Sequence, residues 1–209
     1  MNAIKDQSLH VFLDNLASKN ATPGGGSVAA LMGAQSAALI SMVCNLTLGK
    51  ANYQHVEEDM HTLLTSAESL RLQFTDMIQA DINVFDKLMA AYRLPKETDE
   101  EISARSELIQ HVLTEAIEVP LLCAKACKEA MDLCQRAAEK GNLGVISDAG
   151  VGIMAAYAGL KSAALNVQIN ANCLKDEALA ASKRAELNAL LDGADALLTT
   201  VYQVVESKL

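Results

Sequence analysis

Two aspartates occupy positions where an isolated charge is costly. Asp81 lies three residues after Ile78 and four before Phe85, which places it on the apolar face of a predicted helix. Asp148 is the only charged residue within 141–160. A carboxylate in such surroundings needs a cationic partner, or it exchanges protons in a shielded site. We therefore take both as candidate catalytic acids or bases. For Asp81, an ion pair with a buried Lys or Arg is the structural alternative.

A glycine run supplies the second group of candidates. Gly24, Gly25, Gly26 and Ser27 precede a long apolar segment, and Ser27 is a suitable N-cap for the helix expected there. The free N–H groups of a helix N-terminus bind anions. The run lacks the Lys-Ser/Thr of a Walker loop and follows no predicted strand, so it indicates an anion or close ligand contact rather than a nucleotide. Lys50, at the far end of this helix, serves either the helix dipole or a ligand carboxylate.

Small and polar side chains form a line along each of two nearly charge-free helices. Close helix packing explains such lines as well as a ligand does, because buried polar groups need partners in either case. The amides of Asn45, Asn166 and Asn170 are nevertheless candidate substrate contacts. With an advance of about 100° per residue, the first line holds Ser27, Ala34, Ala38, Ser41 and Asn45, and the second holds Asp148, Gly152, Ala155, Gly159, Ser162, Asn166 and Asn170.

Metal ligation and nucleophilic catalysis find little support. Cys123 and Cys127 are one helical turn apart, but Cys134 lies about 10 Å further along the axis, and no His or acidic residue completes the set. These cysteines are better interpreted as small, buried hydrophobic side chains than as metal ligands. The four histidines are scattered. We expect a site without metal or cofactor, built from carboxylates and amides.

Composition sets the class of protein. The 209 residues include 51% hydrophobic and 3% aromatic side chains, with no alternating β-type run, which favours packed helices. A net charge of −9 argues against nucleic acid as a partner. The charge-free segment could cross a bilayer by length, but its polar residues and the missing aromatic and basic flanks argue against a membrane protein. With no signal sequence and five cysteines, an odd number, we expect a cytoplasmic location.

Helical periodicity and breakers predict about six long helices in one domain, residues 1–209. We expect an all-α bundle around a buried central helix. Pro120 should kink or break the fourth helix. The predicted ranges are 6–19, 28–48, 53–92, 99–139, 148–173 and 176–207.

Five separated motifs resemble one family. They are TPGGGSVAALMGA, MVCNLTLGKANY, DINVFDKLMAAYRLP, GNLGVISDAG and AALNVQINA, spread over nearly the whole chain. In this order they resemble the formiminotetrahydrofolate cyclodeaminase and methenyltetrahydrofolate cyclohydrolase family. The resemblance implies an all-helical homodimer that acts on a tetrahydrofolate derivative without metal or nucleotide. In animals the family domain follows a formiminotransferase domain, whereas here the motifs begin near Met1, so a single-function chain is expected.

The implied chemistry fits the candidate residues. Cyclodeamination of 5-formiminotetrahydrofolate needs a base for N10, an acid for the leaving amine and negative charge near the cationic product, and Asp81 and Asp148 are the candidates. The asparagines would hold the pterin edge or the attacking nitrogen, and the glycine-run amides with Lys50 would hold the anionic end. Hydrolysis of 5,10-methenyltetrahydrofolate is the alternative reaction. A non-enzymatic helical oligomerisation module is the more distant alternative.

Overall fold

The computed structural model describes residues 4–209, and within that range all regular secondary structure is helical, with no strand. Residues 1–3 of the predicted domain lie outside the described part. The predicted all-α class is confirmed. The α-helices are α1 (Leu9–Leu16), α2 (Gly25–Asn45), α3 (Glu57–Tyr92), α4 (Asp99–Lys140), α5 (Ile146–Ala171), α6 (Glu177–Leu191) and α7 (Ala194–Glu206), with short 3₁₀ helices at Ile4–Asp6, Ala51–Val56 and Leu143–Val145.

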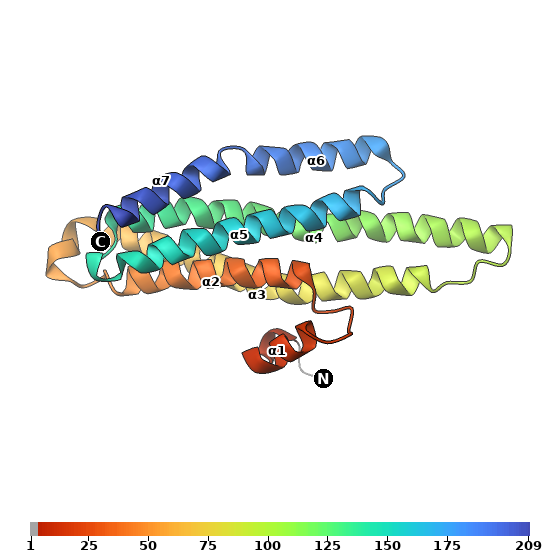
Figure 1. The fold of residues 1–209 in the computed structure, drawn as a ribbon, viewed down its shortest axis with the longest axis horizontal. Helices are drawn as coiled ribbons and strands as arrows, with labels where there is room; N and C mark the ends of the chain where they lie inside the picture. The colour runs from red at the N-terminus through yellow and green to blue at the C-terminus, as the bar shows by residue number, and fades with distance from the viewer. Residues whose placement is uncertain (1–3) are drawn as a thin grey trace.

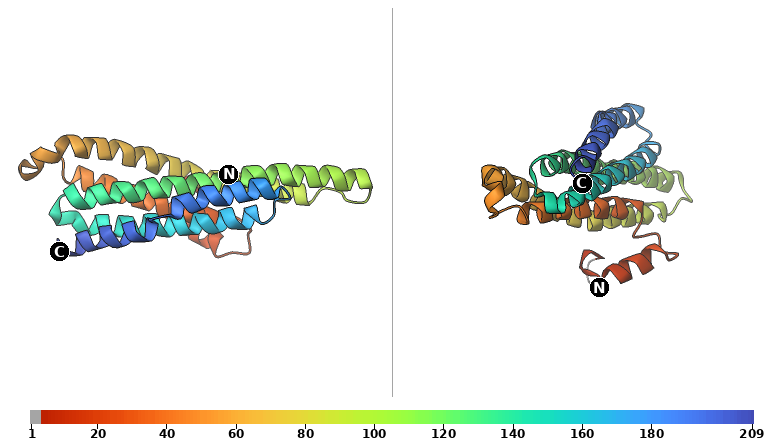
Figure 2. Two further views of the ribbon diagram at one scale, coloured as in Figure 1. Left: turned by 90° about the horizontal axis from the view of Figure 1, so that it is seen from above. Right: turned by 60° about the vertical axis from the view of Figure 1, so that its left-hand side comes forward.

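The helices form an elongated bundle in which α4 contacts α2, α3, α5, α6 and α7, and one face of α2 stays exposed. Helix α2 packs against α3, α4 and α5, while α6 and α7 lie along one side of the bundle (Figure 1). Helices α3 and α4 project past the others at one end as a long hairpin (Figure 1). Helix α1 lies apart from the bundle, on the side opposite α6 and α7 (Figure 2). Phe12 is its only buried residue.

Glycines allow α2 to approach its neighbours closely. A Cβ at Gly33 would lie 2.3 Å from the Phe74 ring, and one at Gly159 would lie 3.1 Å from the Ala29 carbonyl oxygen. Packing therefore explains much of the two small-residue lines. By length and composition alone, α2 and the segment Leu143–Ala171 could each cross a membrane, but 56% and 44% of their most apolar windows are buried inside the bundle.

Several predicted helix boundaries were wrong. Helix α2 begins at Gly25 with Gly24 as its N-cap, so Ser27 lies inside the first turn and caps nothing. The predicted last helix is divided in two because Gly193 adopts φ +71°, a left-handed conformation that ends α6. Helix α4 is continuous through Pro120, so the break considered there does not occur. The first helix is shorter than predicted.

The described residues, 4–209, form two separate hydrophobic cores. The main core joins α2, α3, α4, α5 and α7 and includes Phe74 and Ile78 of α3. The second lies within the projecting hairpin and is much smaller. Its buried residues are Leu88, Ala91, Ile109, Val112 and Leu113.

Candidate active site at the start of α2

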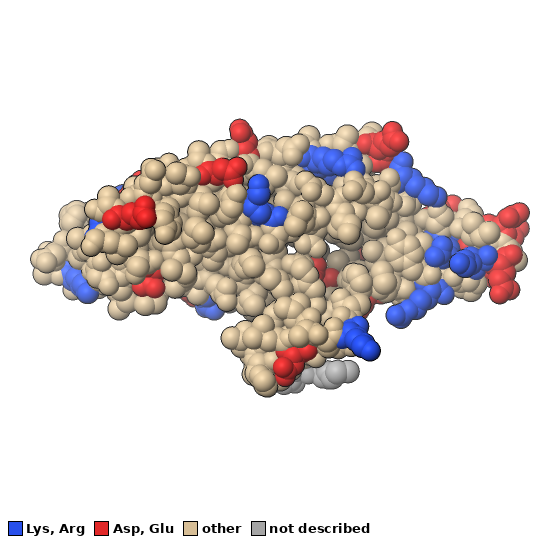
Figure 3. Space-filling model, in the orientation of Figure 1, with Lys and Arg blue, Asp and Glu red and all other residues tan. Residues whose placement is uncertain are grey.

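The Asp81 carboxylate lies against the first turn of α2. The Ser27 hydroxyl donates to its Oδ2 at 2.9 Å and is also 3.3 Å from the Ile78 carbonyl oxygen. A Cβ built on Gly26 would lie only 2.0 Å from Asp81 Oδ1. The carboxylate therefore occupies space that any other residue at position 26 would fill. Near the start of α2 the molecular surface is hollowed beside α1, with acidic atoms inside the hollow (Figure 3).

The environment of Asp81 favours proton exchange. No Lys or Arg of residues 4–209 forms an ion pair with it, so the predicted structural alternative is not found in the described chain. Burial raises the pKa of the Asp81 carboxyl, and the hydroxyl and backbone N–H of Ser27 partly oppose that rise. A half-buried carboxyl with a raised pKa and no counterion is suited to general acid–base catalysis.

The glycine run therefore binds an anion that belongs to the chain itself. Part of the N-terminal face of α2, at Gly26 and Ser27, is taken by Asp81 rather than left for a ligand. A negative charge at this position is favoured by the helix dipole. The N–H groups of Gly24 and Gly25 precede the first backbone hydrogen bond of α2, from the Val28 N–H to the Gly24 carbonyl oxygen, so the helix itself does not use them.

Two predicted asparagines have different surroundings. A Cβ on Gly25 would be 3.8 Å from Asn166 Nδ2, so the Asn166 side chain lies beside the start of α2. Its Nδ2 donates to the Ser162 carbonyl oxygen, which leaves Oδ1 as an acceptor for a ligand. Asn170 Nδ2 instead donates to the Ala116 carbonyl oxygen at 2.8 Å and so links α5 to α4.

The second predicted acid does not join the first within one chain. Asp148 lies in the first turn of α5, eighteen residues before Asn166, which is about 27 Å along a helix. Asn45 is likewise nineteen residues after Gly26 on α2, or about 28 Å away. Lys50 follows the end of α2 and is exposed. The predicted site thus separates into a group at the start of α2 and another at its end.

The small-residue lines could not reveal this separation. A helical periodicity gives the direction of a side chain around the axis, not its level along the axis. Glu68 and Arg71 of α3 were not selected from the sequence at all. They form an ion pair beside Ser41 and Asn45, at the second group. Their spacing of three residues is a common surface pattern, so it gave no specific signal.

The cysteines behave as buried hydrophobes. Cys123, Cys127 and Cys134 are all buried, and desolvation raises the pKa of the Cys134 thiol to about 12. Within residues 4–209 no three His, Cys, Asp or Glu side chains are grouped as metal ligands would be.

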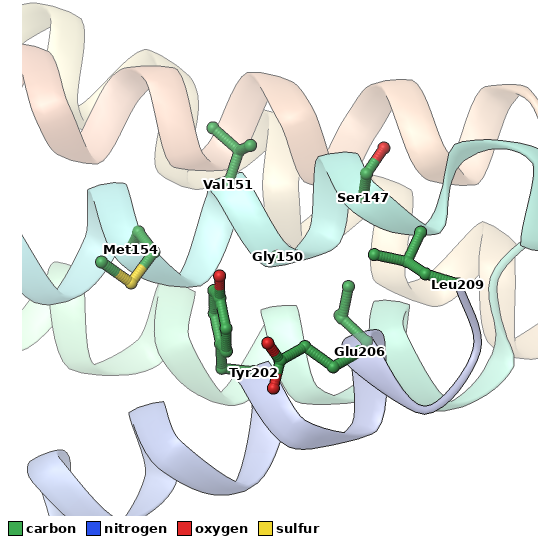
Figure 4. A pocket seen from close by; sticks show the side chains of 8 residues that line it. Ser147, Gly150, Val151, Met154, Tyr202, Glu206 and Leu209 are labelled. Atoms are coloured by element: carbon green, nitrogen blue, oxygen red, sulfur yellow. The ribbon is translucent and has the colours of Figure 1, made fainter.

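An apolar groove lies between α7 and the first turns of α5, far from Asp81 of α3. It encloses about 370 Å³ and has Met154 and Tyr202 on facing helices (Figure 4). Glu206 is the only carboxylate side chain in its lining, so the groove has no acid–base pair for the expected chemistry. The remaining lining residues are Ser147, Gly150, Val151, Val205 and Leu209.

Known proteins resemble the chain over its full length. A family model described as formiminotransferase-cyclodeaminase matches residues 8–189. A methenyltetrahydrofolate cyclohydrolase of Methylorubrum extorquens is 52% identical over 97% of this chain and 98% of its own. A formimidoyltransferase-cyclodeaminase of Rattus norvegicus is 32% identical over 99% of this chain, which spans only 38% of the rat protein. The crystal structure of a formiminotetrahydrofolate cyclodeaminase from Thermotoga maritima superposes with a TM-score of 0.80 at 30% identity, covering 99% of this chain and 97% of its own.

Proposed function

The chain belongs to the formiminotransferase-cyclodeaminase family, and from that premise we propose that it hydrolyses 5,10-methenyltetrahydrofolate to 10-formyltetrahydrofolate. As a member, it is an enzyme of folate one-carbon metabolism. The end-to-end identity of 52% with a methenyltetrahydrofolate cyclohydrolase carries the choice of reaction. The sequence alone had favoured cyclodeamination, with hydrolysis as the alternative.

Asp81 provides the acid–base chemistry in this proposal. The methenyl carbon bridges N5 and N10 and carries a positive charge, which the ionised carboxylate attracts. Asp81 takes a proton as water forms a C–O bond to that carbon. It then gives the proton to N5 as the C–N5 bond breaks. The second proton of the water leaves to solvent as the carbonyl forms, and the formyl group stays on N10.

Other groups at the start of α2 would hold the substrate. The free N–H groups of Gly24 and Gly25 and the Oδ1 of Asn166 offer donors and an acceptor beside the Asp81 carboxylate. Ser27 and Gly26 act on Asp81: the first fixes its orientation, and the second leaves room for it. The proposed steps use no metal and no cofactor other than the folate itself.

Cyclodeamination is the second candidate, favoured by the similarity to the Thermotoga maritima enzyme. There N10 attacks the formimino carbon, and Asp81 passes the N10 proton to the imino nitrogen. A further proton from solvent lets ammonia leave as the C–N bond breaks, which gives the methenyl product. The tetrahedral adduct sits at the same carbon in both reactions, so one carboxylate serves either.

The methenyl chromophore distinguishes the two reactions. Accelerated loss of its absorbance on 5,10-methenyltetrahydrofolate supports hydrolysis, and its appearance from 5-formiminotetrahydrofolate supports cyclodeamination. Asp81→Asn should lower kcat by about 100- to 10,000-fold, the usual contribution of a general acid–base group. An Asp81→Asn variant that keeps its helical circular dichroism and full turnover refutes the role of Asp81.

We also propose that two copies associate through the apolar surface of α2, α5 and α7. Met42, Val151, Met154 and Tyr202 are each at least 42% exposed there. Such a surface favours association because burial removes apolar area from water. Size-exclusion chromatography with light scattering tests this proposal. Met154→Glu should shift a dimer to monomer, and a wild-type protein that is monomeric at micromolar concentration contradicts it.

A further inference from the structure

A small pocket lies between the N-terminal segment and the α2–α3 pair. It encloses about 170 Å³, and the 3₁₀ turn before α1 borders it. None of the steps proposed for Asp81 uses this pocket. Its apolar lining is formed by Leu9 and Phe12 of α1, Leu31 of α2 and Ile78 of α3.

Hydrogen bonds to α3 fix the segment that covers this pocket. The Ile4 N–H donates to Gln79 Oε1 at 3.0 Å. Lys5 Nζ donates to Asp76 Oδ1 at 2.6 Å. Phe12 follows on α1 and is the one buried residue of that helix. The pocket wall that α1 contributes is therefore attached to the same helix that carries the catalytic carboxylate.

The size and lining of the pocket fit one aromatic ring. An apolar cavity of about 150 Å³ lined by Leu, Ile and Phe side chains is large enough to bind benzene. This pocket has the same types of side chain and a similar volume. The ring of Phe12 also favours a second aromatic ring in an offset or edge-to-face arrangement. We therefore expect a group of the size of benzene as its occupant.

The distance from the pocket to Asp81 fits the aminobenzoyl ring of a folate. Ile78 precedes Asp81 by three residues, or about 4.5 Å along α3. Leu31 follows Ser27, the hydrogen-bond partner of Asp81, by four residues, or about 6 Å along α2. Because α2 and α3 are antiparallel, both displacements have the same direction. The ring is bonded to N10, and bond lengths of about 1.3–1.5 Å put its centre roughly 4 Å from the methenyl carbon. A methenyl carbon beside the carboxylate therefore places the ring at the level of the pocket.

The order of groups along α2 matches the order of groups in the substrate. Gly25, with Asn166 beside it, precedes Ser27 on α2, and Leu31 follows Ser27. A pterin has amide and amino groups for polar partners, whereas the aminobenzoyl ring has apolar faces. The pterin is joined to the methenyl carbon through N5 and the ring through N10. A substrate along α2 therefore has its polar end on one side of the carboxylate and its ring on the other.

We propose that the pocket between α1, α2 and α3 binds the aminobenzoyl ring of the substrate whose one-carbon unit reacts at Asp81. The inference rests on the proposed folate activity and adds the residues that recognise the ring next to N10. Phe12 packs against the ring, which makes α1 part of the substrate site. The pocket binds the ring equally in the ground state and the transition state, so its loss raises KM more than it lowers kcat.

A fragment of the substrate tests the pocket. 4-(Methylamino)benzamide carries the nitrogen, the ring and the carbonyl of the aminobenzoyl group but no pterin. It should compete with whichever folate substrate the enzyme turns over. Phe12→Ala should raise the inhibition constant of the fragment and the KM for the folate by about tenfold each, with kcat changed less than about threefold. Circular dichroism should show an intact bundle, because α1 lies apart from it.

Leu9→Ala and Leu13→Ala form a matched pair that does not depend on the buried Phe12. Both leucines are exposed residues of α1, at 61% and 49%, but only Leu9 lines the pocket. Leu9→Ala should raise the inhibition constant and KM by about threefold, and Leu13→Ala should leave both unchanged. A fragment that does not compete, unchanged constants in Leu9→Ala, or an equal rise in Leu13→Ala refutes the ring pocket while the folate activity stands. If wild-type enzyme turns over neither 5,10-methenyltetrahydrofolate nor 5-formiminotetrahydrofolate, the proposed function fails and this inference fails with it.

Discussion

Replacing Gly26 by alanine tests the placement of the catalytic carboxylate directly. The added Cβ would lie 2.0 Å from Asp81 Oδ1 and 2.5 Å from its Cγ, whereas ordinary contact begins at 3.4 Å. The carboxylate must therefore move by about 1.4 Å, the difference between the two distances. Because Ser27 Oγ holds the opposite oxygen at 2.9 Å, this movement also lengthens or breaks that hydrogen bond.

Gly26→Ala should lower kcat strongly and change the stability of the fold little. A misplacement of about 1 Å can reduce a rate by roughly 100-fold, so we expect kcat to fall by about that factor or more. Stability should change little, since alanine is favoured over glycine by about 0.5–1 kcal/mol within a helix and the clash is with a movable side chain. Initial rates from the methenyl absorbance give kcat, and thermal melts followed by circular dichroism give Tm.

Two alanine variants show whether the effect belongs to position 26. A Cβ on Gly25 meets Asn166 at an ordinary 3.8 Å, so Gly25→Ala should lose less than about threefold if the close packing at Gly26 is the cause. Gly144→Ala, where the Cβ meets Asn142 at 3.4 Å near the start of α5, controls for a glycine replacement remote from Asp81. Wild-type kcat in Gly26→Ala refutes the reasoning. An equal loss in Gly25→Ala assigns the effect to the glycine run as a whole.

Three further variants address the acid–base group, the separated aspartate and the packing of α2. Ser27→Ala removes a hydroxyl that lowers the pKa of Asp81, so this pKa should rise further above its usual range. The acidic limb of the plot of kcat/KM against pH should then move to higher pH. An acidic limb that does not move contradicts the role of Asp81 as the titrating base. Asp148→Asn should keep at least half of wild-type kcat if the site lies within one chain, whereas a loss as large as that of Asp81→Asn assigns Asp148 to a site shared with a partner subunit. Gly33→Ala places a Cβ 2.3 Å from the Phe74 ring and should destabilise the fold by about 1–3 kcal/mol, lowering Tm by roughly 2–4 °C per kcal/mol in a chain of this size; an unchanged Tm means that Phe74 repacks without strain.

Local patterns predicted the faces of the helices well. The spacing of Asp81 from Ile78 and Phe85 indicated a partly buried carboxylate, and the structure places it so. The glycine run was predicted to bind an anion or a close ligand, and this stays a prediction; the structure places the Asp81 carboxylate of the same chain against Gly26. What sequence spacing could not show is that residues 26 and 81, fifty-five positions apart, would meet. That contact depends on the antiparallel packing of α2 and α3, which Gly33 and Phe74 set in register.

Positions along the axis of the bundle could not be predicted from the sequence. Asp148 was selected with Asp81 because both stand out as charges in apolar surroundings, and within one chain they lie at different levels of the bundle; the role of Asp148 stays a prediction. The leucine and valine spacing of the last helix continued across Asp192 and Gly193, so periodicity did not reveal the left-handed residue that ends α6. A glycine within a helical pattern is tolerated often enough that it did not indicate a break.

The small second core in the α3–α4 hairpin has a consequence for hydrogen exchange. Five buried residues hold this hairpin together, so its amides should exchange through a local opening that costs less free energy than global unfolding. The main core would stay closed during that opening. On α3, Asp81 lies between Ile78 of the main core and Leu88 of the hairpin core. The carboxylate thus marks the boundary between two cooperative units, where protection from exchange should change from that of the bundle to that of the hairpin.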